Sequence, residues 1–125
     1  MNYNINSFIF VVISLLLTIY GQIIIKYRIN LYPKVPDDVI PKIKSVLRFF
    51  LDPYILSGLF AALIASFFWM LALTNLSITR AYPIMASAPI IILIFGVFTL
   101  NESLTAGKII GAILIFVGII LSAKY

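Results

Sequence analysis

The sequence contains no cysteine and no histidine, and only four of its 125 residues are acidic: Asp37, Asp38, Asp52 and Glu102. Without cysteine, the chain can form no disulfide and has no thiol chemistry. Without histidine, and with so few carboxylates, it cannot assemble a zinc site, a Ser-His-Asp triad or a paired-carboxylate hydrolase. We therefore expect no enzyme activity, no bound metal and no cofactor.

Charge is also scarce: charged residues make up 10% of the chain, whereas hydrophobic residues make up 63%. This is far from the balance of a soluble domain. A helix that spans a bilayer needs roughly 20 mostly apolar residues, and the chain has four segments of this kind. The sequence therefore predicts an all-α, four-transmembrane-helix bundle. It forms a single domain over residues 1–125, with helices at about 7–25, 53–75, 80–100 and 105–123.

The loop at residues 26–52 holds three of the six prolines and most of the charge. Within it, apolar residues recur at helical spacing from about residue 40 to residue 51, with basic residues on the other face. This pattern favours a short amphipathic helix in the membrane interface; the alternative is a stiff, solvated loop. Asp52 and Pro53 then provide a good N-cap and first position for the second spanning helix.

Two features distinguish the last two spanning helices. Pro83 and Pro89 each remove a backbone donor, so we expect the third helix to be bent or locally unwound. Broken helical backbone is tolerated in lipid only where it faces protein or a wet cavity, so this helix is a candidate cavity wall. In the fourth helix, Gly107, Gly111 and Gly118 are predicted to let another helix approach closely, within the chain or between chains.

The basic residues are distributed unevenly. Seven of the nine lie on the side of the long loop, and only Arg80 and Lys124 lie on the other side. Basic loops prefer the cytoplasm, so we expect the loop at 26–52 in the cytoplasm and both termini outside. This placement indicates contact with anionic lipid rather than with nucleic acid. The strong bias predicts one orientation, hence a parallel homo-oligomer or a partner chain of opposite bias.

Four strings in the chain resemble the four-helix members of the drug/metabolite transporter superfamily, the EamA-like and small multidrug resistance-like proteins. In chain order they are GQIIIK at 21–26, DPYILSGL at 52–59, AYPIMAS at 81–87 and LNESLTAGKIIGAILIFVGIILS at 100–122. The resemblance covers nearly the whole chain. Two branches are relevant: the small multidrug resistance exporters of cations, and subunits resembling the aminoarabinose-undecaprenyl phosphate flippase.

One departure separates these two branches. The exporters depend on a glutamate three residues before the glycine of the shared G-x-x-x-x-K string, and here that position is Thr18. A membrane-embedded carboxylate binds the cation and accepts the proton in such pumps, and the predicted spans contain no other acid. The GQ before Lys26 and the AYP string also look more like the flippase-type branch.

Five residues are candidates for substrate binding: Thr18, Gln22, Lys26, Arg80 and Tyr82. The first three are spaced i, i+4, i+8 and form a polar stripe on one helix face, which either substrate contact or helix–helix hydrogen bonding explains. Lys26 and Arg80 are predicted at opposite interfaces, where each suits a lipid phosphate; simple snorkelling is the alternative. Tyr82 matches the tyrosine of the family's third-helix motif, which lines the cavity in the exporters.

The resemblance implies a transporter that flips a polyprenyl-phosphate-linked sugar or a similar amphipathic anionic lipid across a bacterial or archaeal inner membrane. Its partners would be this undecaprenyl phosphate-type glycolipid and, in a homo- or hetero-dimer, a second small transporter subunit. Two alternatives remain open. One is an exporter of small hydrophobic or cationic metabolites, and the other is a non-transporting accessory subunit of a membrane glycosyltransferase.

Overall fold

The computed structural model describes residues 5–125, and within them every regular element is a helix. Four helical segments are long and apolar enough to cross a membrane, with the third of them made of two helices. The predicted all-α fold with four membrane-spanning segments is therefore confirmed. The elements are α1 (Ile5–Leu31), α2 (Val39–Phe49), α3 (Pro53–Leu73), α4 (Ile78–Met85), α5 (Ala88–Thr99) and α6 (Ala106–Lys124).

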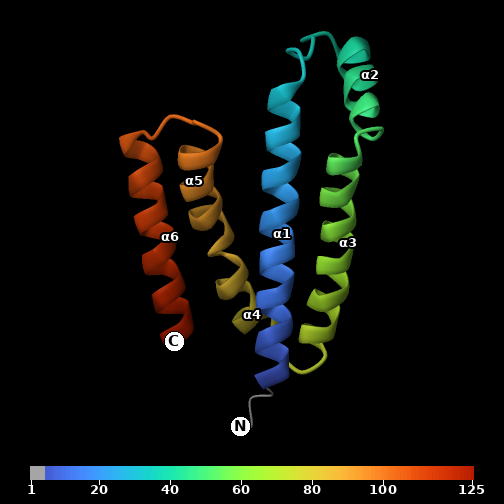
Figure 1. Ribbon diagram of the computed structural model, residues 1–125. Coiled ribbons are helices and arrows are strands. Elements are labelled where there is room, and N and C mark those ends of the chain that lie inside the picture. Colours follow the sequence, from blue (N-terminus) through green and yellow to red (C-terminus); the bar gives the residue numbers. More distant parts are fainter. Residues whose placement is uncertain (1–4) are drawn as a thin grey trace.

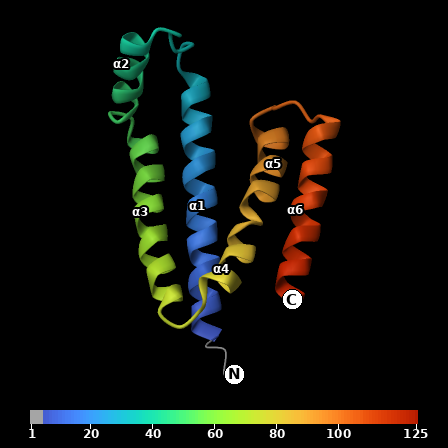
Figure 2. The ribbon, with the colours of Figure 1, turned by 180° about the vertical axis from the view of Figure 1, so that it is seen from behind.

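The spanning segments run alternately up and down, so that the start of α1 and the end of α6 lie at one end of the bundle and α2 lies at the other (Figures 1 and 2). The two ends are called here the termini end and the α2 end. α1 packs most extensively against α3, whereas α4 and α5 cover another side of α1. α6 packs against α4 and α5 at the edge of the molecule.

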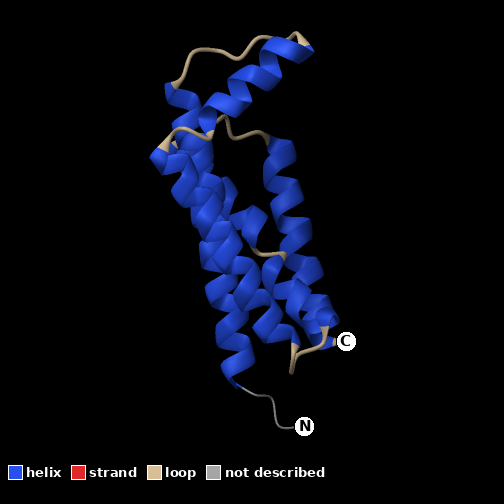
Figure 3. Cartoon of the chain, turned by 90° about the vertical axis from the view of Figure 1, so that its right-hand side faces the viewer, coloured by secondary structure: helices blue, strands red, loops and turns tan. Residues whose placement is uncertain are grey.

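The loop region differs in detail from its prediction. α1 continues to Leu31, so the basic residues at 26–28 lie within the helix rather than after it. The amphipathic helix is present as α2, and it is inclined to the long axis of the spanning helices (Figure 3). Its Phe49 is buried and its ring lies 5.2 Å from that of Tyr32. This contact holds one edge of α2 while its apolar residues stay exposed, as a helix in a membrane interface requires.

Two glycines bring α1 and α3 into close contact. A Cβ atom on Gly21 would lie 2.8 Å from the carbonyl oxygen of Gly58, and a Cβ atom on Gly58 would lie 3.0 Å from the carbonyl oxygen of Gly21. About two helical turns away, the buried Ser14 hydroxyl donates a 2.8 Å hydrogen bond to the Ala65 carbonyl of α3. Small residues permit this approach, which replaces hydrophobic driving force with packing and hydrogen bonding.

The third spanning segment is interrupted at Ala86–Ser87, between the two prolines that the sequence singles out. Pro83 lies inside α4, and Pro89 occupies the first turn of α5, where its missing N–H costs nothing. The Ser87 hydroxyl donates to the Ile84 carbonyl at 2.6 Å. The same carbonyl also accepts the Ser87 backbone N–H at 3.1 Å, so both donors of Ser87 bond back to the last turn of α4.

α6 is the least covered element, because none of its residues is buried. A Cβ atom on Gly111 or Gly118 would meet no atom within 4 Å, and one on Gly107 would meet only Thr105 of its own N-cap at 3.9 Å. These three glycines therefore make no close helix contact within residues 5–125.

α5 ends before Asn101, which adopts a φ of 54°, a conformation that Asn tolerates at a helix C-terminus.

Candidate functional site

A small pocket lies at mid-depth between α1, α3 and α4. Thr18, one of its lining residues, is the midpoint of α1, thirteen residues from either end of that helix. The pocket has a volume of about 360 Å³, in the range of small-molecule sites. We call it the central pocket. Its lining residues are Ser14, Thr18, Ala62, Ala65, Ser66, Trp69, Tyr82 and Met85.

The polar groups of the central pocket are hydroxyls and an indole, without any charge. The Thr18 and Ser66 hydroxyls donate to carbonyls of their own helices, at 2.8 Å and 3.0 Å, and so retain only acceptor capacity. The rings of Trp69 and Tyr82 meet edge to face, with 5.6 Å between their centroids. Within residues 5–125, the Trp69 N–H and the Tyr82 hydroxyl have no hydrogen-bond partner. The pocket therefore offers both donors and acceptors to a polar, uncharged group.

Thr18 and Tyr82 are thus brought together, although they are 64 positions apart in the chain. Gln22 and Lys26 continue the same face of α1 toward the α2 end, where both are exposed and line none of the hollows described here. Arg80 lies elsewhere, in a hollow at the termini end. The five predicted residues therefore do not share one pocket. Thr18 and Tyr82 lie at mid-depth, Gln22 and Lys26 extend the polar stripe toward the α2 end, and Arg80 lies at the termini end.

A second hollow, the apolar groove, lies between α1 and α5 on another face of α1. It has a volume of about 640 Å³ and is lined mainly by bulky side chains, among them Leu16, Ile23, Tyr27 and Phe95. Close helix packing in membranes uses small residues, as at Gly21 and Gly58. The bulky lining of the groove suits hydrocarbon chains instead.

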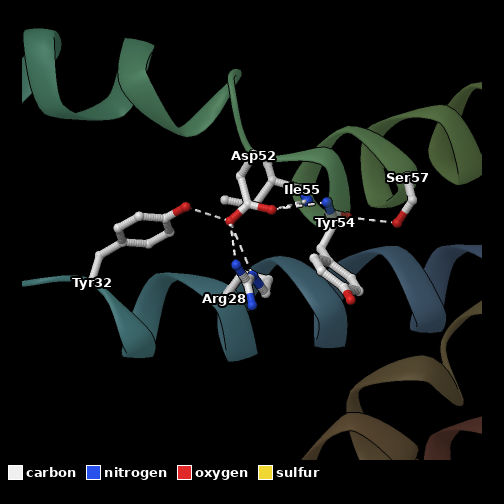
Figure 4. A network of polar contacts seen from close by, with 6 residues as sticks. All are labelled: Arg28, Tyr32, Asp52, Tyr54, Ile55 and Ser57. Atoms are coloured by element: carbon white, nitrogen blue, oxygen red, sulfur yellow. Dashed lines mark hydrogen bonds and ion pairs between the residues drawn. The ribbon is translucent and has the colours of Figure 1, made fainter.

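The most extensive polar network joins the ends of α1 and α3 at the α2 end (Figure 4). Asp52 is only 4% exposed. Its Oδ2 atom accepts from the Arg28 guanidinium, with Nε and Nη2 each at 3.0 Å, and from the Tyr32 hydroxyl. Its Oδ1 atom caps α3 by accepting from the backbone N–H of Tyr54 at 2.8 Å. Arg28 also lies over the Tyr54 ring, 4.6 Å from its centroid. We call Arg28, Tyr32, Asp52 and Tyr54 the polar clamp.

The clamp shifts the titration of both of its groups that lie outside the spanning segments. The hydrogen bond from Tyr32 lowers the pKa of the Asp52 carboxyl, and the Tyr54 N–H and Arg28 act in the same direction against the effect of burial. The same hydrogen bond raises the pKa of the Tyr32 phenol, because ionisation would remove the proton that it donates to Asp52. The clamp is therefore built for ionised Asp52 and neutral Tyr32.

These directions predict how stability depends on pH. A carboxyl with a lowered pKa stabilises the fold above its ordinary value of about 4, and this contribution is lost as pH falls through the lower folded value. A phenol with a raised pKa contributes below about pH 10, and that contribution is lost as pH rises through its folded value. We therefore expect the stability difference between the wild type and Asp52→Asn to be constant from pH 5 to 9 and to shrink below about pH 4. Thermal unfolding followed by circular dichroism in detergent measures this difference.

A difference that stays unchanged down to pH 2.5 would contradict the role of the ionised carboxylate. Asp37→Asn is the matched control, because Asp37 is exposed in the loop before α2. Its difference from the wild type should stay small across the same pH range.

Sequence reasoning found the N-cap role of Asp52 but missed its pairing with Arg28. The available signal was position: an acid at the start of one span and a cation at the end of the preceding span share one depth in a membrane. It also missed Gly21 and Gly58 as packing residues. Glycines in two spans that must be neighbours across a long loop provide only a weak signal, because nothing in the sequence gives the rotation of the helices.

In comparison with known proteins, the chain matches the EamA-like transporter family over residues 2–124. No curated protein and no solved structure matches the chain. The match covers almost the entire sequence, and it agrees with the four apolar spans, which point to a multi-pass membrane protein. The chain therefore belongs to the EamA-like transporter family, whose members are transporters, within the drug/metabolite transporter superfamily.

Proposed function

We propose that this transporter moves an amphipathic anionic lipid, of the type of a polyprenyl-phosphate-linked sugar, from one leaflet of the membrane to the other. The central pocket is the observation that carries the proposal. It lies at mid-depth and is lined by hydroxyl and indole groups, and none of its lining residues is charged. A pocket of this kind suits the hydroxyls of a sugar and has no carboxylate with which to bind a cation or exchange a proton.

The path of the head group follows from the same face of α1. From the central pocket, Gln22 and Lys26 continue the polar stripe to the α2 end, where a phosphate meets a cation. Arg80 provides a cation at the termini end. The hydrocarbon chain remains in the bilayer throughout, and the apolar groove gives it a surface along α1 and α5. In this orientation the α2 end is cytoplasmic and both termini are outside, as the excess of basic residues indicates.

The path is closed by a second subunit. An exposed glutamine at membrane depth needs protein or water beside it, and Gln22 is exposed in the single chain. The glycine-bearing face of α6 is likewise uncovered. Both features support a dimer, with an identical chain or with a second small transporter, in which α6 packs against the neighbouring subunit.

A second candidate function is export of small hydrophobic metabolites without a lipid carrier. The size of the central pocket, about 360 Å³, and the aromatic pair formed by Trp69 and Tyr82 favour a small ligand. The two functions differ in whether translocation requires a polyprenyl phosphate.

Translocation in proteoliposomes tests the proposal, with a polyprenyl-phosphate sugar supplied on one side. Native mass spectrometry of protein purified from its own host first identifies the oligomer and any retained lipid. We expect Thr18→Glu to reduce translocation roughly tenfold or more, because a buried carboxylate repels the phosphate that must pass it. Thr18→Val, which keeps the shape, should have a smaller effect.

The matched control for Thr18→Val is Thr74→Val, the same change at the exposed C-cap of α3, which does not line the central pocket. Lys26→Ala and Arg80→Ala test the two ends of the path. If both leave translocation untouched, the electrostatic part of the proposal is wrong. Transport of small metabolites without any polyprenyl phosphate would favour the second function.

A further inference from the structure

A third hollow, at the termini end, brings together groups that the sequence does not connect. It has a volume of about 600 Å³ and lies where the start of α1, the start of α4 and the end of α6 meet. We call it the terminal hollow. Its polar lining comes from Thr79, Arg80, Ser122 and Lys124, and its apolar lining includes Phe8 and Ile119. Arg80 is the third residue of α4, and Lys124 is the last residue of α6.

The charge of the terminal hollow is positive. Arg80 and Lys124 are both cationic, whereas all four acidic residues of the chain lie in the loop before α2, at the start of α3 or in the turn after α5, at the α2 end (Figure 1). The start of α4 adds about half a positive charge, and the end of α6 subtracts about as much. A carboxylate at the end of the chain beside Tyr125 would subtract one further charge and still leave the hollow positive.

The geometry suits phosphate in particular. A guanidinium presents paired N–H donors that match two phosphate oxygens, and an ammonium adds a compact charge. The hydroxyls of Thr79 and Ser122 add short donors from two different helices. The first turn of α4 also leaves backbone N–H groups without helical partners, and such helix starts favour anions.

The depth and the apolar lining indicate that the phosphate belongs to a lipid. Thr79 and Lys124 lie at the ends of spanning segments, which is the level of lipid head groups in a bilayer of ordinary thickness. Phe8 and Ile119 lie further along their helices toward the membrane interior, so they meet the apolar part of a ligand whose phosphate binds the cations. A free phosphate ion would make no favourable contact with this apolar lining.

We propose that the terminal hollow is a binding site for the phosphate of an anionic lipid in the leaflet at the termini end, with Arg80 and Lys124 as its two cationic ligands. The proposal rests on the lipid translocation proposed above, for which this hollow is the head-group site at the termini end. It adds Lys124, Thr79 and Ser122 to Arg80, the one substrate-binding candidate that the sequence suggests at this end. Because it concerns equilibrium binding, it can be tested without transport.

The absence of cysteine allows a local probe. Tyr125→Cys, labelled with an environment-sensitive fluorophore, places a reporter at the edge of the terminal hollow, and the remainder of the chain contains no competing thiol. The labelled protein in neutral detergent is titrated with phosphatidylglycerol, with phosphatidylcholine and with inorganic phosphate. We expect a saturable signal with phosphatidylglycerol and none with phosphatidylcholine. Inorganic phosphate should bind at least tenfold more weakly, because it lacks an apolar part.

Lys124→Gln is the first variant, because it changes an exposed side chain at the end of a helix and leaves the fold intact. Loss of a charge-assisted phosphate contact should weaken binding of phosphatidylglycerol roughly tenfold. Arg80→Gln should weaken it at least as much, and Arg80→Lys should restore part of the loss. Lys34→Gln, which removes one charge at the α2 end, is the matched control and should leave the local signal unchanged.

Three results would overturn the proposal: equal binding by the wild type and Lys124→Gln, equal saturation by phosphatidylcholine, or saturation by inorganic phosphate at the same concentrations as by lipid. The last would assign the hollow to free phosphate. Binding that persists in a protein unable to translocate lipid would leave the site standing and would contradict the function proposed above. Translocation that continues in the Lys124→Gln and Arg80→Gln variants without any local binding would contradict the binding site and would leave the proposed translocation standing.

Discussion

Replacing Gly21 with alanine is expected to destabilise the protein by about 1–3 kcal/mol, the usual effect of overpacking a close contact. The new Cβ atom would lie 2.8 Å from the Gly58 carbonyl oxygen. That oxygen belongs to the backbone of α3, so relief requires the two longest helices to move apart rather than one side chain to rotate. The hydrogen bond from Ser14 to Ala65, at 2.8 Å, would lengthen with them. Reversible unfolding in mixed detergent micelles measures the change in the free energy of unfolding.

The matched control is Gly118→Ala in α6, where a Cβ atom meets nothing within 4 Å. There, the gain in helix propensity of about 0.5–1 kcal/mol should appear without a clash. In the monomer, Gly118→Ala should therefore raise the free energy of unfolding, whereas Gly21→Ala should lower it. Gly58→Ala should also destabilise the protein. Its Cβ atom would lie 2.7 Å from Ile24 Cγ2, which the stiff χ1 of a β-branched side chain holds in place, and 3.0 Å from the Gly21 carbonyl oxygen. Equal effects at Gly21 and Gly118 would show that α1 and α3 do not pack through their glycines.

Replacing Asp52 with alanine is expected to open the α2 end of the molecule. One substitution removes the acceptor of Arg28, the acceptor of Tyr32 and the cap of α3 together. Arg28 would be left without its carboxylate at the edge of the membrane. Removing one member of an ion pair leaves the other charge uncompensated, which destabilises the fold more than replacing both members. We expect a lower thermal midpoint and faster hydrogen exchange from residue 32 to residue 56, with little change in α6.

Asp37→Ala provides the control for this second prediction, since it removes the same charge from an exposed position in the same loop. Its effect on the midpoint should be several-fold smaller. Asp52→Asn should fall between the two, because an amide oxygen can still accept from Tyr54. If Asp37→Ala and Asp52→Ala behave alike, the loss of net charge rather than the clamp would explain the result.

The two predictions concern residues that the sequence presents very differently. Asp52 stands before Pro53 at the start of an apolar run, so its role as N-cap could be predicted from local chemistry alone. Its partner Arg28 could not, because the predicted first helix ended near residue 25 and α1 continues to Leu31. Gly21 and Gly58 form no local pattern at all. They become meaningful only when the rotation of two helices about their axes is known.

The candidate site shows the same division. The spacing of Thr18, Gln22 and Lys26 predicts one polar face of a helix, and Tyr82 was chosen from the family resemblance. The structure places Tyr82 in the same pocket as Thr18 and adds Trp69 and Ser66 from α3, residues whose types alone are equally consistent with contact to lipid. It also separates Arg80 from this pocket and places it in the terminal hollow together with Lys124, the last residue of α6.

What the sequence determined by itself is the number of spans, the helical class and the interrupted third segment. In lipid, a backbone must satisfy its own hydrogen bonds, so an apolar run of sufficient length has no alternative to a helix, and proline limits that helix locally. Only the tertiary structure decided which faces of the helices meet. Nearly every side chain on these helices is apolar, and between apolar surfaces in a membrane the contact is chosen by shape and a few hydrogen bonds, which involve residues far apart in the chain.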